Sequence, residues 1–104
     1  MSKQSTLNAG TVVWIPCELK SGIFPTERHV KIEVSVGDRG AILGFIPSED
    51  VRPDAEPERG RVRSVVLRAI NGKVELLFRG EILSTSNPVT VPREWLESVG
   101  KIEA

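Results

Sequence analysis

A strict alternation of apolar and polar residues is the feature that most limits how this chain folds. The apolar positions are Val30, Ile32, Val34 and Val36, and the polar positions between them are His29, Lys31, Glu33 and Ser35. Successive side chains of a β-strand point to opposite faces, so this period of two predicts a strand with one buried face and one exposed face.

A second strong signal is Asn71-Gly72, which separates two β-rich runs at 61–70 and 73–79. A type I′ hairpin turn needs a positive φ at both central residues, and Asn-Gly meets that need well. The pattern therefore predicts a β-hairpin at this place. Further strands are expected at 11–19, 41–47, 81–84 and 89–91.

Two prolines and a glycine shape the ends of the expected elements. Pro16 donates no hydrogen bond to a neighbouring strand, so the first strand should lie at a sheet edge or bulge there. Pro92 suits the start of a helix and Gly100 suits its end, which predicts a closing helical segment of one or two turns.

Composition points to the same fold class. The 104 residues include 26 β-branched ones (13 Val, 8 Ile and 5 Thr) against 14 Ala, Leu and Met, which favours a pleated sheet over helices. The length suits one domain. No run approaches the roughly 18 apolar residues of a membrane span, and the first ten residues lack the apolar core of a signal peptide. With a single Cys, no internal disulfide can form. We expect a cytoplasmic protein without membrane contact.

The segment Gly44–Val51, GFIPSEDV, resembles the end of a Src-homology-3 domain. That family commonly ends with a glycine, an aromatic residue, Ile or Val, Pro, Ser, Asn, Tyr and Val, and six of the eight positions agree here. Glu49 stands in the place of the Asn and Asp50 in the place of the Tyr. In the family, the Pro and the Tyr help to line a groove for proline-rich peptides. Pro47 is present but the chain has no Tyr, so the resemblance implies a small barrel and not this peptide groove.

These signals together predict an all-β fold: a small, closed or partly open, SH3-like β-barrel of five to seven short antiparallel strands with a short C-terminal helical turn. We expect one domain over residues 10–100, a mobile tail at 1–9, a long acidic loop at 48–60 and a C-terminal tail at 101–104. The expected core is Val13, Ile15, Val30, Ile32, Val34, Ile42, Ile46, Val62, Val74, Leu76, Phe78, Val89 and Leu96.

Residues that could carry out catalysis are scarce. His29 is the only histidine and Cys17 the only thiol, and no flanking motif makes them a base and a nucleophile. We interpret them as an exposed strand histidine and a buried apolar cysteine. The chain has neither a phosphate-binding glycine loop nor zinc-ligand spacing. We therefore expect no enzymatic activity, no catalytic residue and no cofactor.

The acidic loop is also a weak candidate for a metal site. Its carboxylates at Asp50, Asp54, Glu56 and Glu58 could in principle hold calcium, but the spaced acids, central glycine and terminal Glu of an EF-hand are absent. We expect a solvated loop and no metal.

Charge is distributed unevenly within the neutral total. Residues 49–58 have a net charge of −4, and residues 59–79 have a net charge of +5. Arg59, Arg61 and Arg63 are spaced two apart, so on a strand they share one face. This row could contact phosphates or an acidic protein. It could equally be the solvated face of a half-buried strand, partly neutralised by the acidic loop.

Two hypotheses for function follow. The first is a non-catalytic module that binds a protein, which could be a second copy of the chain through an edge strand. The alternative is an RNA- or DNA-binding barrel that uses Arg59, Arg61, Arg63 and Lys73. Base stacking needs exposed aromatic residues. Phe24, beside Pro25, is the aromatic residue expected to be exposed, because Trp14, Phe45 and Phe78 are expected in the core.

Overall fold

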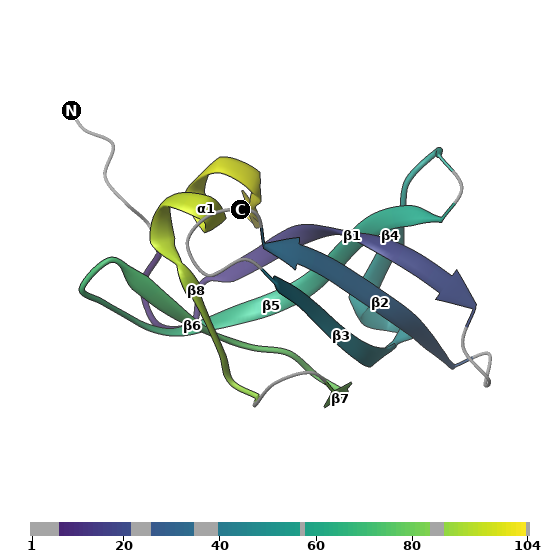
Figure 1. Ribbon diagram of the computed structural model, residues 1–104, viewed down its shortest axis with the longest axis horizontal. Coiled ribbons are helices and arrows are strands. Elements are labelled where there is room, and N and C mark those ends of the chain that lie inside the picture. Colours follow the sequence, from purple (N-terminus) through teal and green to yellow (C-terminus); the bar gives the residue numbers. More distant parts are fainter. Residues whose placement is uncertain (1–6, 22–25, 35–39, 57, 84–86, 104) are drawn as a thin grey trace.

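Antiparallel strands make up most of the chain and form one strongly curled sheet (Figure 1). The computed structural model describes residues 7–21, 26–34, 40–56, 58–83 and 87–103. The elements are β1 Val12–Ser21, β2 Glu27–Val34, β3 Gly40–Pro47, the 3-10 turn η1 Ser48–Asp50, β4 Val51–Pro53, β5 Arg59–Ile70, β6 Lys73–Leu77, β7 Glu81–Ile82, β8 Val89–Pro92, the helix α1 Arg93–Val99 and β9 Lys101–Ile102.

The sheet follows the order β7-β3-β2-β1-β5-β6-β8, with β4 added to β5 and β9 added to β1. β7 and β8 stand at the two ends of this path, so the described strands curl into a half-barrel that stays partly open. The short helix α1 lies between β8 and β9 near the C-terminal end of the described residues. This confirms the expected all-β class and the C-terminal helical turn. Five to seven strands were expected; seven lie on the main path, and the short strands β4 and β9 are additional.

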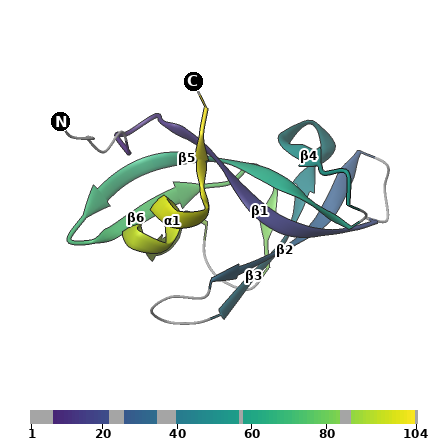
Figure 2. The ribbon, with the colours of Figure 1, turned by 90° about the horizontal axis from the view of Figure 1, so that it is seen from above.

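β5 is the central strand. Its first half lies between β1 and β4, and its second half pairs with β6. The register shifts between Val66 and Arg68, which leaves Leu67 as the extra residue of a bulge. A bulge bends a strand and strengthens its twist. Figure 2 shows the result: the β5–β6 hairpin curves away from the part of β5 that crosses β1.

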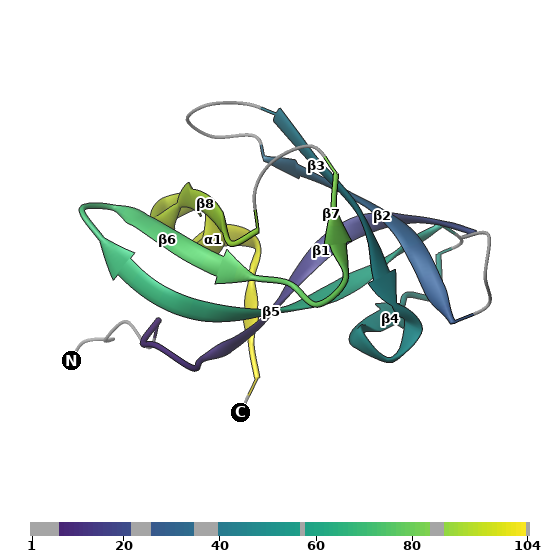
Figure 3. The ribbon, with the colours of Figure 1, turned by 90° about the horizontal axis from the view of Figure 1, so that it is seen from below.

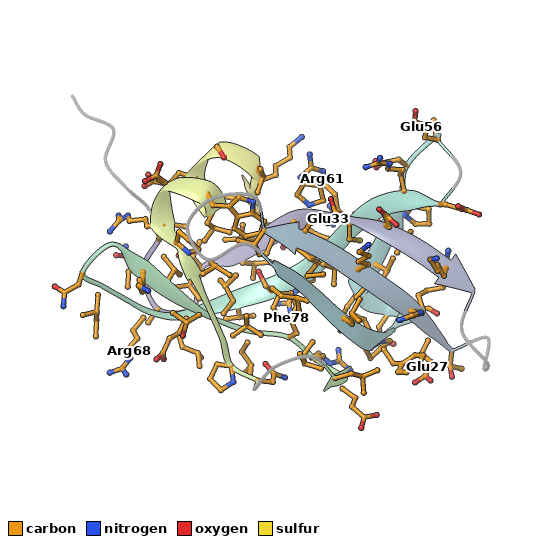
Figure 4. The ribbon with its side chains drawn as sticks, in the orientation of Figure 1. Glu27, Glu33, Glu56, Arg61, Arg68 and Phe78 are labelled. Atoms are coloured by element: carbon orange, nitrogen blue, oxygen red, sulfur yellow. The ribbon has the colours of Figure 1, made fainter. Side chains whose placement is uncertain are left out.

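The expected hairpin turn and core are both confirmed. Asn71 has φ 52° and Gly72 has φ 76°, as a type I′ turn requires. All thirteen residues of the core set named in the sequence analysis are buried, with Phe78 near the centre of the core (Figure 4). The core also contains residues that the sequence did not place there, notably Leu19, Val66 and Trp95. Val36, at the end of the alternating segment, lies outside the described residues.

Three of the expected boundaries are corrected by the structure. Leu7 was assigned to the mobile tail, but its side chain is buried in the core. Lys101–Ile102 was assigned to a C-terminal tail, but it forms β9 against Val13 and Trp14. The expected acidic loop begins with η1 and β4, which pairs with β5 over Val51–Pro53. In the last two cases the segment supplies hydrogen-bond partners to a strand edge that would otherwise lack them.

Gly80 marks the place where the chain leaves β6 and crosses to β7, beside β3 (Figure 3). Its φ is 96°, and a Cβ there would lie 2.2 Å from the backbone oxygen of Phe45. Gly72 also has a positive φ, but nothing lies within 4 Å of its Cβ position. Both positions favour glycine because their φ is positive. Of the two, only position 80 also lacks space for a Cβ atom.

We expect Gly80→Ala to destabilise the fold much more than Gly72→Ala. The positive φ costs an alanine about 1 to 2 kcal/mol at either site, and the clash with the β3 backbone adds to this cost only at residue 80. Urea unfolding of both variants measures the difference. Equal losses of unfolding free energy would show that the crossing chain can move away from β3.

Candidate functional site: an arginine face on the outer side of the sheet

The expected arginine row lies on one face of β5. Along this strand Val62 and Ser64 are buried, whereas Arg61 and Arg63 point to the other side and Arg59 is exposed. The Ser64 hydroxyl donates a hydrogen bond of 2.8 Å to the backbone oxygen of Val13, which ties the inner side of β5 to β1. The prediction of a shared face for the three arginines is therefore confirmed.

β4 adds a fourth arginine to this face. Arg52 is the direct cross-strand partner of Arg61. Like charges in directly opposite positions are destabilising, so their retention needs a compensating contact. The sequence pattern alone does not assign Arg52 to this face, because β4 lies within the expected acidic loop 48–60. We call Arg52, Arg59, Arg61 and Arg63, with Trp14 among them, the arginine face.

Trp14 lies on this outer face, opposite Arg63 in the register of β1 and β5. Its side chain is buried, but it does not belong to the apolar core cluster. The Arg52 guanidinium covers the ring, with Cζ 3.9 Å from the ring centroid. The indole Nε1 donates a 2.6 Å hydrogen bond to Glu103 Oε1. The burial expected for Trp14 is confirmed, but its side chain lies outside the apolar core cluster: cation–π contact and hydrogen bonding bury it on the opposite side of the sheet.

Arg61 has a structural contact that Arg59 and Arg63 lack. β1 pairs with β9 at Val13 and Trp14 and with β2 from Glu18 onward, which leaves Pro16 in a gap between the two strands. Arg61 Nη1 donates to the backbone oxygens of Trp14, at 3.3 Å, and Val99, at 3.4 Å. Figure 4 shows its side chain at the upper side of the sheet. Pro16 has no N–H to leave unpaired at such a gap. The expected edge strand or bulge is corrected: β1 lies between β2 and β5 in the sheet, and its register with β5 continues through Pro16 without a shift.

The acidic segment does not neutralise this face through direct ion pairs. Among the described residues, none of the four arginines forms an ion pair within 4.0 Å. Glu56 projects at the tip of the β4–β5 loop (Figure 4). Glu49 and Asp50 instead pair with Arg79, at 3.1 Å and 3.3 Å. The face therefore keeps cationic groups that are open to an external anion.

Lys73, another expected site residue, does not extend this face. Lys73 lies at the start of β6, beside the hairpin turn, and lines a separate cavity described below. Phe24 lies outside the described residues. The structure therefore adds Arg52 and Trp14 to the predicted site residues Arg59, Arg61 and Arg63, and it places Lys73 elsewhere.

A second feature of the outer face is an aromatic pair. His29 and Phe45 are cross-strand partners on β2 and β3, and their rings stack with centroids 5.0 Å apart. Both residues are half-buried. Phe45 was expected in the core, and this expectation is wrong: Ile42 and Ile46 face the core, so Phe45 faces outward with the odd-numbered residues of β3.

Cys17 and His29 do not meet. Cys17 belongs to the core cluster, whereas His29 stacks on Phe45 at the outer face. Burial raises the pKa of the Cys17 thiol from 9.0 to about 12, and the charge of Asp54 adds to the rise. Nearby Arg28 and Arg61 act in the opposite direction. A thiol held in its protonated form is a poor nucleophile.

A small cavity of about 240 Å³ opens at the gap beside Pro16 and includes Arg59, Glu18 and Glu33 in its lining. In the part of the chain that the structure describes, no group of three His, Cys, Asp or Glu side chains could hold a metal ion. No helix among the described residues is both long and apolar enough to cross a membrane.

No family model matches this chain, and neither the curated proteins nor the solved structures contain a match.

The buried thiol makes stability depend on pH. Between pH 9 and about 12 the unfolded chain releases the Cys17 proton while the folded chain keeps it, so stability falls as the pH rises through this range. We expect the wild type to lose about 1 to 2 kcal/mol more than Cys17→Val between pH 8 and pH 10.5. Urea unfolding at both pH values measures this difference, because the lysines titrate alike in the two proteins. Parallel losses would contradict the shifted pKa.

The contact between Arg52 and Trp14 has its own test. In a Trp95→Phe background, Trp14 is the sole indole, and we expect Arg52→Ala to raise its quenching by acrylamide. The variant should also lose about 0.5 to 1 kcal/mol of stability. Arg59→Ala removes the same charge from the same face without uncovering the ring, and it should leave quenching unchanged. Equal quenching in the two variants would mean that Arg52 does not cover Trp14.

Proposed function

We propose that the protein is a non-catalytic binding module that docks an acidic segment of another protein on its arginine face. The observation that carries this proposal is the set of four arginines on the two adjacent strands β4 and β5 without a described ion-pair partner. Guanidinium groups bind carboxylates through charge-assisted, often bidentate hydrogen bonds.

The contacts of the four arginines divide them into two that are held in place within the protein and two that are available to bind a partner. Arg52 is held against Trp14, and Arg61 is held against two backbone oxygens. These contacts orient the two side chains and reduce the entropy that binding would cost them. Arg59 and Arg63 lie on either side of Arg61 in the strand, two residues away in each direction. They are the side chains with donors free of described partners, so they carry most of the proposed contact.

Single-stranded nucleic acid is a second candidate, favoured by the stacked pair of His29 and Phe45 on the same outer face. A half-buried aromatic ring offers one surface for base stacking. Trp14 does not, because Arg52 covers it. One partly exposed aromatic pair gives less support than four arginines, so the acidic protein segment remains the leading proposal.

Fluorescence anisotropy with a labelled peptide of ten glutamates and a labelled U10 oligonucleotide tests both candidates. We expect the peptide to bind at low salt and the affinity to fall as salt is added. Arg59→Gln with Arg63→Gln should weaken peptide binding by at least about tenfold, since each charge-assisted hydrogen bond contributes roughly 1.5 to 3 kcal/mol.

The matched control is Arg68→Gln with Arg93→Gln. It removes the same total charge from arginines already paired with Glu75 and Glu97, and Arg68 lies at the far hairpin (Figure 4). It should keep most of the affinity. An equal loss in both double variants would show that only the total charge matters. No peptide binding at low salt would overturn the leading proposal, and tighter binding of U10 would establish the second candidate in its place.

A further inference from the structure

The open side of the half-barrel contains a cavity of about 440 Å³ between the start of β3 and β8. Its apolar lining comes from Val34, Ile42, Val89 and Val91, which are buried residues of the three strands β2, β3 and β8. Lys73, Asn71 and Gly72 line its other end. A volume of this size falls in the usual range of ligand-binding pockets, roughly 300 to 1,000 Å³. We call this cavity the barrel groove.

One wall of the barrel groove is the open edge of β8. Among the described strands, β8 pairs only with β6, with Val74 opposite Val91 and Leu76 opposite Val89. The Arg93 N–H donates to the Gly72 oxygen, toward the β6 side. Peptide groups alternate in direction along a strand, so the N–H and C=O of Thr90 point the other way, to the open edge.

The opposite wall is the open edge of β3. Leu83 N–H donates to the Leu43 oxygen, so the peptide groups of Leu43 point away from β2. Ala41 has the same parity as Leu43, so its N–H and C=O point to the same edge. β7 and the adjoining Leu83 cover this edge at Leu43, Gly44 and Phe45, and no described strand pairs with it at Ala41. An open edge is a template for another strand.

We propose that an extended peptide binds in the barrel groove as an added strand, with main-chain hydrogen bonds to Thr90, Ala41 or both. Alternate aliphatic side chains of the peptide would pack on the valines and isoleucine of the groove, and a carboxylate near one end would meet Lys73. Lys73 is exposed and forms no ion pair with a described residue. This site is separate from the arginine face and does not depend on the function proposed for that face.

The chemistry of the walls favours a peptide over a small apolar ligand. An apolar molecule would cover the peptide groups of Thr90 and Ala41 and leave them without hydrogen bonds, which is costly. A strand satisfies them while its side chains fill the apolar lining. This is the mode of recognition in which main-chain bonds give affinity and side-chain pockets give specificity.

The probe is a blocked heptapeptide with valine at alternate positions, threonine between them and one aspartate near its end. Its partner probe has the same sequence with alternate peptide nitrogens methylated, which removes N–H donors. We expect the first probe alone to bind, and to slow hydrogen exchange at the amide of Thr90 or Ala41 by at least tenfold. Exchange of the paired amides of β6 should change little. NMR on the full chain reads out each amide separately.

Two variants on neighbouring strands locate the site. Gly40 pairs with Val34, so a side chain there points into the groove, and nothing lies within 4 Å of its Cβ position. Gly40→Ile should therefore fill the groove, keep the fold and weaken probe binding at least tenfold. The control Glu33→Ile places the same side chain on the exposed outer face of β2, away from the groove lining, and should bind like the wild type.

Binding that survives Gly40→Ile, or that leaves exchange at Thr90 and Ala41 unchanged, would overturn the proposal. So would a dimer, detected by light scattering without peptide, that already protects these amides, because the occupant would then be a second copy. The variant Arg59→Gln with Arg63→Gln should bind the heptapeptide normally, so failure of the arginine-face proposal and failure of this one are distinguishable.

Discussion

The pairing of β5 with three other strands is the constraint on which the rest of the structure depends. This single strand is paired with β1, β4 and β6. Its inward residues, such as Val62 and Val66, lie in both halves of the core. The bulge at Leu67 lets β5 change direction between the part that pairs with β1 and β4 and the part that pairs with β6. It does so because an extra residue bends the backbone without ending the hydrogen-bonded ladder. A straight β5 would flatten the sheet and open the core.

The same strand builds the arginine face. Because side chains alternate along β5, its arginines lie on the outer face while Val62 and Ser64 face inward. β4 adds Arg52 to the same face as the cross-strand partner of Arg61. Trp14 makes this crowding of cations tolerable, because its ring forms a cation–π contact with the Arg52 guanidinium and its Nε1–H donates a hydrogen bond to the Glu103 carboxylate. The tryptophan is therefore buried by charged groups and not by the hydrophobic core. Because Trp14 and not a carboxylate compensates for the neighbouring charges, the arginines of this face remain available to bind an anion.

Curling without closure produces the other candidate surface. The sheet ends at β7 and β8, and β7 covers only part of the β3 edge. The barrel groove is the space that remains, with peptide groups on both walls and apolar side chains on its lining. The arginine face and the barrel groove belong to different parts of one sheet, and they suit different partners: one attracts charge, and the other offers hydrogen bonds to an extended backbone.

Local patterns determined much of this protein. The alternation at 29–34 and the Asn71-Gly72 turn depend on backbone geometry within a few residues, and so does the shared face of Arg59, Arg61 and Arg63. These features, the all-β class and the expected core could be predicted from the sequence. Tertiary structure decided the features that depend on how the strands are ordered and paired in the sheet.

The burial of Trp14 under Arg52 is one such outcome, because the two residues lie 38 positions apart in the sequence and meet only across β5. The strand roles of β4 and β9 are others, since segments this short become strands only where a longer neighbour offers unpaired peptide groups. The outward position of Phe45 belongs here too. Both faces of β3 carry apolar residues, so its pattern alone does not say which face is buried, and pairing with β2 settles it.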